Sequence, residues 1–170
     1  MNITVIGIGQ PLRGDDGIGP EAVRRWLLSY SPNPSDPLIK TVLLETPGID
    51  LLDFLAEMDV AILVDAVSTG KPPGMVQVFS SFPETGLSAA EKTAHGFGVA
   101  ETIAIARKSG VRLPGRLVLI GIEGSRYDLG SGLSEPVRQA IPEAVREIQK
   151  QVYEFFSTKN TKETRRSRRI

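Results

Sequence analysis

Residues 3–19, with the sequence ITVIGIGQPLRGDDGIG, decide how this chain of 170 residues folds. The first six of them are mostly β-branched and predict a buried strand that runs into a glycine-containing loop. After the loop, apolar side chains recur at helical spacing, and Pro20 is compatible with a first helical turn. These apolar residues are Ile18, Ala22, Val23, Trp26 and Leu27. The chain therefore begins with a strand, a loop and a helix.

The same alternation continues toward the C-terminus. Apolar runs predict further strands at 41–44, 60–64, 75–79 and 116–122, and helical spacing predicts helices at 49–57, 99–109 and 133–156. The connection 68–74 is too short for a crossover helix, so the strand after it should be an antiparallel edge strand. We predict a three-layer α/β/α fold with an open, mostly parallel, twisted sheet of about five strands.

Composition predicts one globular domain with a charged terminus. With 41% hydrophobic and 24% charged residues, the chain can form a buried core, and we place a single α/β domain at 1–156. Residues 157–170 contain six basic residues and one acidic residue, a net charge of +5, and predict a solvated, disordered tail. The other 156 residues carry a net charge of −5, which argues against nucleic-acid binding.

Residue types that are missing narrow the possible chemistry. The chain has no cysteine, which excludes disulfides, thiolate metal sites and cysteine nucleophiles, so a metal would need oxygen and imidazole ligands. The first residues do not resemble a signal peptide, and no apolar run is long enough to cross a membrane. We expect a cytoplasmic monomer with no membrane partner.

Three polar segments should meet at one edge of the predicted sheet. Asp15 and Asp16 lie in the first loop, Asp65 ends the strand at 60–64, and His95, the only histidine, precedes a helix. Ligand sites of open parallel sheets lie beyond the C-terminal ends of the strands. Carboxylates and an imidazole suit a divalent ion such as nickel or zinc, with positions left open for water or substrate.

Each of these residues also has a simpler explanation. Asp15 or Asp16 could cap the following helix by accepting its first N–H groups, and we assign this role to Asp15 and the site role to Asp16. Asp65 could satisfy loop N–H groups, and His95 could be structural. Two further acidic residues at strand ends, Glu45 and Glu123, are interpreted as ordinary loop carboxylates.

Two other classes of site fit the sequence less well. The first two glycines suggest a dinucleotide-binding turn, but Leu12 occupies the position of its third glycine, and Asp15 and Asp16 would repel a pyrophosphate. A serine hydrolase is disfavoured because the chain has no G-x-S-x-G turn.

The motifs resemble those of the hydrogenase maturation proteases, whose sequences begin with a strand, the pattern G-x-G-N-x-x-x-x-D-(D/E)-G-x-G and a helix. Here the matching segments are 7–19, the strand end Ile62-Leu63-Val64-Asp65-Ala66, and Thr93-Ala94-His95-Gly96. Order and spacing agree over roughly 1–155. Gln10 stands where the family usually has Asn, and this replacement retains a side-chain amide.

The resemblance implies a hydrolase, an endopeptidase that removes the C-terminal extension of a nickel-loaded nickel–iron hydrogenase large-subunit precursor. Asp16, Asp65 and His95 correspond to the residues of the family that contact the metal and act in catalysis. The nickel would be supplied by the precursor, so cleavage would follow nickel insertion. We hypothesise that Asp16 or Asp65 assists attack by water on the peptide bond.

Three alternative functions remain open from the sequence. A non-catalytic nickel-binding assembly module for the hydrogenase precursor would use the same Asp16, Asp65 and His95. A nucleotide-binding regulator is weakened by the missing glycine. An endopeptidase of this fold could also act on a different protein.

Overall fold

The computed structural model describes residues 2–31, 39–82, 92–93 and 98–166. Strands and helices alternate along the chain, as the apolar periodicities predict. In chain order they are β1 (Ile3–Ile8), the 3-10 turn η1 (Gly14–Gly17), α1 (Ile18–Ser29), β2 (Ile39–Leu44), α2 (Ile49–Ala56), β3 (Val60–Ser68), β4 (Val76–Phe79), β5 (Lys92–Thr93), α3 (Val99–Lys108), β6 (Arg116–Glu123) and α4 (Glu135–Arg166).

The strands form one mixed sheet in the order β2-β1-β3-β6-β4. The first four strands in this order are parallel to one another. β4 is antiparallel to β6 and lies at the edge. This arrangement confirms the predicted open, mostly parallel sheet with one antiparallel edge strand. The two-residue β5, which the sequence did not predict, pairs antiparallel with the end of β3.

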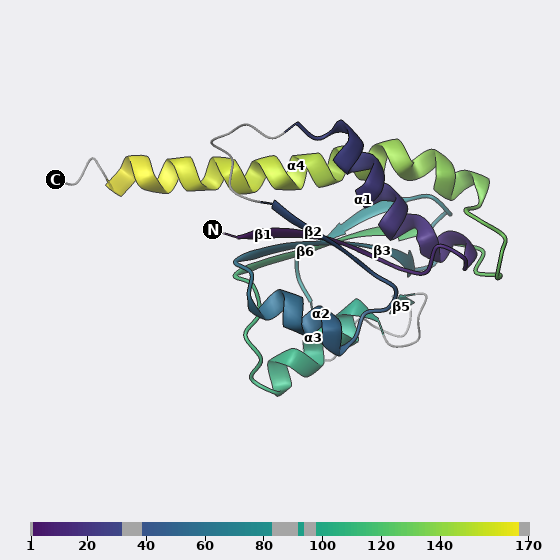
Figure 1. Ribbon diagram of the computed structural model, residues 1–170, viewed down its shortest axis with the longest axis horizontal. Coiled ribbons are helices and arrows are strands. Elements are labelled where there is room, and N and C mark those ends of the chain that lie inside the picture. Colours follow the sequence, from purple (N-terminus) through teal and green to yellow (C-terminus); the bar gives the residue numbers. More distant parts are fainter. Residues whose placement is uncertain (1, 32–38, 83–91, 94–97, 167–170) are drawn as a thin grey trace.

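Helices cover both faces of the sheet, which gives the predicted three layers (Figure 1). α1 and α4 lie on one face, where the buried Trp26 and Ile148 belong to one apolar cluster. α2 and α3 lie on the other face, where Leu51 and Ile103 belong to a second cluster. The indole N–H of Trp26 also donates to Gln149 Oε1 at 2.9 Å, which joins α1 to α4.

β3 is longer than its apolar run predicted. The strand was expected to end at Asp65, but it continues to Ser68. Residues 65–67 keep their pairing with β6, and this ladder explains the extension. Asp65 therefore lies inside a strand rather than at its end. A second local difference concerns Leu27, which was predicted on the apolar face of α1 but is 43% exposed.

α4 also continues past its last apolar residue. The spacing predicted a helix up to Phe156, whereas α4 runs to Arg166, through a segment that contains Lys, Glu and Arg, which all have good helix propensity. Figure 1 shows this C-terminal part projecting beyond the sheet. None of the helices in the described ranges is both long and apolar enough to cross a membrane. The domain boundary at 156 stays a prediction.

Close backbone packing fixes the start of α1 against the sheet. A Cβ atom on Gly19 would lie 2.3 Å from the carbonyl oxygens of both Ile8 and Val64, and a Cβ on Gly7 would lie 2.8 Å from the carbonyl oxygen of Gly19. Only glycine allows the helix to approach β1 and β3 this closely. The glycines of the first motif therefore bring the β1–α1 loop to the C-terminal ends of these two strands.

Candidate functional site

Asp16 lies in η1, and its side chain is almost completely buried. The backbone N–H of Gln10 donates to Asp16 Oδ2 at 2.8 Å, so the loop folds back on this carboxylate. Gly9 permits the fold: its φ is +132°, and a Cβ there would lie 1.8 Å from the carbonyl oxygen of Asp16. The donor is a main-chain group, so the Gln10 side chain, where the resembling motif has Asn, is not needed for this bond.

Asp65 is fully buried in β3. The ladder between β1 and β3 ends at the pair Gly7–Val64. Asp65 is therefore the first residue of β3 beyond that ladder, next to the point where the loop with Asp16 leaves the sheet. Because side chains alternate along a strand, Asp65 faces the same side as Val67, which packs with α2 and α3.

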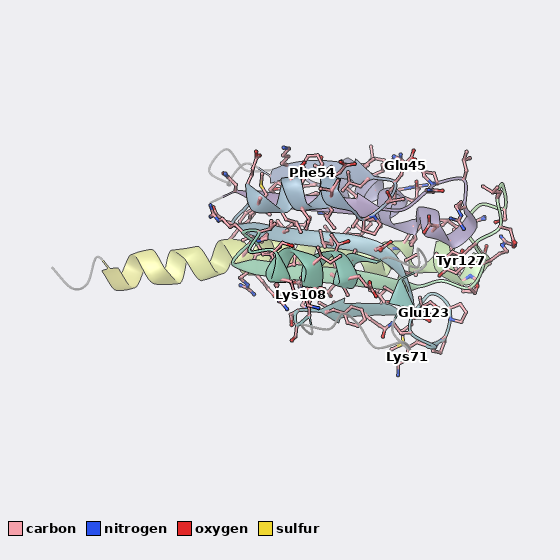
Figure 2. The ribbon with its side chains drawn as sticks, turned by 90° about the horizontal axis from the view of Figure 1, so that it is seen from below. Glu45, Phe54, Lys71, Lys108, Glu123 and Tyr127 are labelled. Atoms are coloured by element: carbon pink, nitrogen blue, oxygen red, sulfur yellow. The ribbon has the colours of Figure 1, made fainter. Side chains whose placement is uncertain are left out.

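The hydroxyl of Tyr127 is buried in the acidic surroundings of this part of the sheet. Burial raises the pKa of this phenol, and the negative charges of Asp15, Glu123, Asp16 and Asp65 raise it further. A Cβ on Gly124 would lie 2.3 Å from the Tyr127 hydroxyl oxygen and 3.2 Å from Asp15 Cβ, so the phenol lies beside Asp15. Figure 2 shows Tyr127 and Glu123 at the same end of the molecule. Nothing in the sequence pattern singled out Tyr127, because its neighbours come from separate segments.

His95, the third predicted site residue, lies outside the described residues. β5 ends at Thr93, two positions earlier in the chain, and Thr93 pairs with Val67 of β3. Within the described ranges, no group of three or more His, Cys, Asp or Glu side chains is arranged to hold a metal ion. The structure thus places Asp16 and Asp65 at one edge of the sheet, and the role of His95 stays a prediction.

Asp15 has a structural role, but not the predicted one. In the described part of the chain, neither η1 nor α1 has a side-chain hydrogen bond from its N-cap residue, and Asp15 reaches the β6–α4 loop instead. Asp15 Oδ2 accepts the N–H groups of Ser125 and Arg126, both at 2.9 Å, and Ser134 gives its N–H to Oδ1 at 2.6 Å. The predicted helix cap is therefore wrong.

These hydrogen bonds also set the charge state of Asp15. Burial alone would raise the pKa of this carboxyl group, but the hydrogen bonds from Ser125, Ser134 and Arg126 outweigh burial and hold the pKa below its ordinary value. The N–H of Asp15 donates to the carbonyl oxygen of Arg126 at 2.7 Å. An ionised Asp15 thus ties the loop that carries Asp16 to the loop that leads into α4.

Glu123 is also a structural acceptor, which agrees with its interpretation as a loop carboxylate. Its side chain is buried at the end of β6 and accepts the N–H of Thr69 at 2.8 Å and the N–H of Gly70 at 2.9 Å. The hydroxyl of Thr69 donates to the same carboxylate at 2.8 Å. Glu123 therefore holds the β3–β4 loop. Glu45, in contrast, is exposed and lines a groove beside β2.

Two buried carboxylates at one sheet edge can do two kinds of chemistry. Their oxygens are ligands that a divalent cation accepts, and a neutral imidazole would complete a mixed set suited to nickel or zinc. A carboxylate can also take a proton from an attacking water. Burial strengthens both effects, because charges interact more strongly away from bulk water. The fixed position of Asp16, held by the Gln10 N–H, suits either role.

Comparisons with known proteins identify the family. The family model of HycI, described as a hydrogenase maturation protease, matches residues 44–151. The hydrogenase expression/formation protein HupD of Thiocapsa roseopersicina is 33% identical over 149 residues, and the match covers 84% of this chain and 64% of that protein's length. The protein of the same name from Rhizobium leguminosarum bv. viciae is 32% identical over 145 residues, 84% of this chain and 70% of that protein.

A solved structure agrees in both fold and sequence. The hydrogenase maturating endopeptidase HybD from E. coli superposes with a TM-score of 0.71 at 26% identity, over 91% of this chain and 93% of that one. The predicted fold class is therefore confirmed by an independent structure as well as by the topology. The family model, the sequence relatives and the shared fold agree, and this chain belongs to the hydrogenase maturation protease family.

Proposed function

We propose that this protein is an endopeptidase that removes the C-terminal extension of a nickel-loaded nickel–iron hydrogenase large-subunit precursor. The observation that carries the proposal is the placement of Asp16, in η1, and Asp65, in β3 just beyond its ladder with β1, where both carboxylates are buried. Membership of the maturation protease family supports the reaction class. The names of the relatives refer to hydrogenase expression and formation and to a hydrogenase maturating endopeptidase, which supports the choice of substrate.

In this proposal the nickel is part of the substrate. Asp16, Asp65 and His95 would contact nickel already bound in the precursor, through oxygen and imidazole ligands. This contact with nickel would fix the position of the precursor beside Asp16 and Asp65. A precursor without nickel would lack this contact, so the protease would discriminate loaded from unloaded substrate through a difference in binding.

The peptide bond would be cut by water with the help of a carboxylate. The water oxygen adds to the scissile carbonyl carbon while Asp16 or Asp65 takes the water proton. The carbon–nitrogen bond then breaks, and the proton passes to the nitrogen of the departing extension. The N–H of Gln10 donates to Asp16 and holds its carboxylate in one orientation. A catalytic group that is already oriented has less conformational freedom to lose during the reaction.

A processing assay tests the proposal directly. Purified protein is incubated with nickel-loaded precursor, and the precursor mass is followed by intact-protein mass spectrometry. We expect loss of one discrete C-terminal peptide with the wild type and with the control Asp53→Asn, an exposed position on α2. Asp16→Asn and Asp65→Asn should abolish processing with the fold retained. Stable binding of an uncut precursor by the wild type would instead favour the assembly-module alternative.

A further inference from the structure

A groove of about 280 Å³ lies between α1 and α4, close to the site. Glu21, Arg24 and Arg25 line it on the α1 side, and Arg138 and Ile141 line it on the α4 side. Both helices begin at the sheet edge that carries Asp16, because they follow β1 and β6, which are parallel to β3. The groove therefore opens beside residues 21–25 of α1 and the first two turns of α4.

A second groove connects this one to the site. It has a volume of about 170 Å³, shares Pro11 and Arg24 with the first groove, and reaches Gly9 and Glu45. Gly9 packs directly against the backbone of Asp16. Arg24 thus stands where the two grooves meet, on a path that starts next to Asp16 and leads away between the helices.

The charges of the first groove differ from those of the whole domain. Three arginines and one glutamate line it, whereas residues 1–156 carry a net charge of −5. Arg25 is paired with Glu21 at 2.8 Å, and Arg138 donates to the carbonyl oxygen of Leu133 at 3.1 Å and lies 3.9 Å from Glu135. Arg24 makes no hydrogen bond or ion pair with any other residue in the described part of the chain. The groove therefore has an unmatched positive charge.

We propose that this groove binds the extension of the substrate through a carboxylate, with Arg24 and Arg138 as the recognising residues. The inference rests on the proposed function, because the extension leads away from the scissile bond at Asp16. A guanidinium group binds a carboxylate through two parallel hydrogen bonds, a geometry that lysine does not reproduce. The carboxylate belongs either to an Asp or Glu side chain of the extension or to its C-terminal end.

Peptide binding tests the groove without cleavage. Fluorescence anisotropy compares three labelled peptides: an acidic extension, its Asn/Gln counterpart, and the acidic peptide with an amidated C-terminus. Arg24→Gln and Arg138→Gln should each raise the Kd of the acidic peptide about threefold to tenfold, and added salt should reduce the difference. Arg24→Lys should fall between wild type and Arg24→Gln. A loss confined to the amidated peptide assigns the C-terminal carboxylate, and a loss confined to the Asn/Gln peptide assigns acidic side chains.

The matched control is Arg112→Gln. Arg112 is exposed, precedes β6 at the opposite edge of the sheet, and lies 3.7 Å from Asp59. In the processing assay, Arg24→Gln should raise KM and leave kcat nearly unchanged, while Arg112→Gln should match the wild type. Equal effects of Arg24→Gln and Arg112→Gln in both assays would overturn the proposal that the groove binds the extension. If the wild type did not cut the loaded precursor, the proposed protease function would be refuted. The peptide-binding assay involves no cleavage, so the two proposals can fail separately.

Discussion

Ser134 binds Asp15 with two donors: its N–H lies 2.6 Å from Oδ1 and its hydroxyl 2.9 Å from Oδ2. The two residues are 119 positions apart in the sequence, so this contact joins the loop that carries Asp16 to the loop that precedes α4. Ser134 directly precedes α4, and its carbonyl oxygen accepts the N–H of Arg138 at 2.9 Å. Its hydroxyl, however, serves the β1–α1 loop.

Asp15→Asn should destabilise the fold strongly. An amide in place of the carboxylate removes one acceptor oxygen and the negative charge, and leaves donors of Ser125, Arg126 or Ser134 unsatisfied. We expect the free energy of unfolding to fall by about 3 kcal/mol in urea titrations. Asp128→Asn, an exposed change in the same β6–α4 loop, should alter it by less than about 0.5 kcal/mol. Equal effects of the two variants would contradict the role given to Asp15.

The same carboxylate should make stability depend on pH. The pKa of Asp15 is lower in the folded protein than its ordinary value of 3.8, so the unfolded chain binds a proton more readily. The stabilisation is present above the ordinary pKa and is lost as the pH falls below about 4. Thermal melts from about pH 7 to about pH 3 should therefore show the gap between wild type and Asp15→Asn narrowing below about pH 4. A constant gap would show that the charge of Asp15 contributes little.

Glu123→Gln should loosen the β3–β4 loop. The substitution replaces one acceptor oxygen by an amide group that faces the N–H groups of Thr69 and Gly70. Hydrogen exchange should accelerate at these two amides, with a loss of about 2 kcal/mol in the free energy of unfolding. The exposed Glu45→Gln is the control and should leave both measurements unchanged.

Gly19→Ala should disrupt the start of α1. The added Cβ would lie 2.3 Å from two backbone carbonyl oxygens, neither of which can rotate away. We expect a loss of about 3 kcal/mol or failure to fold, measured by thermal unfolding of the purified variant. Gly48→Ala offers the comparison, because no atom lies within 4 Å of its added Cβ. That variant should lose less than about 1 kcal/mol.

The layers of the fold could be predicted because they depend on local patterns. The apolar strand and helical spacing of residues 3–29 identify a β–loop–α unit before any contact is known, and the short 68–74 connection identifies the antiparallel β4. The Schellman turn at Gly110, with φ +69°, likewise follows from a glycine after the last apolar residue of α3.

The hydrogen-bond partners of Asp15 could not be predicted in this way. A carboxylate just before a helix most simply predicts a helix cap, whereas the N–H groups that donate to Asp15 lie more than 100 residues away in the sequence. The length of β3 could not be predicted either, because its continuation past Asp65 depends on pairing with the distant β6 and not on its own apolar residues. The placement of Asp16 and Asp65 on the same side of the sheet was predictable, because parallel strands bring their C-terminal ends together.

The most direct test of the account is processing of two precursors that differ only in nickel. Wild-type protein is mixed with nickel-loaded and with nickel-free large-subunit precursor, and both are followed by intact-protein mass spectrometry. We predict loss of one discrete C-terminal peptide from the loaded precursor alone, abolished by Asp16→Asn. Equal cleavage of both precursors would contradict recognition of nickel through Asp16, Asp65 and His95.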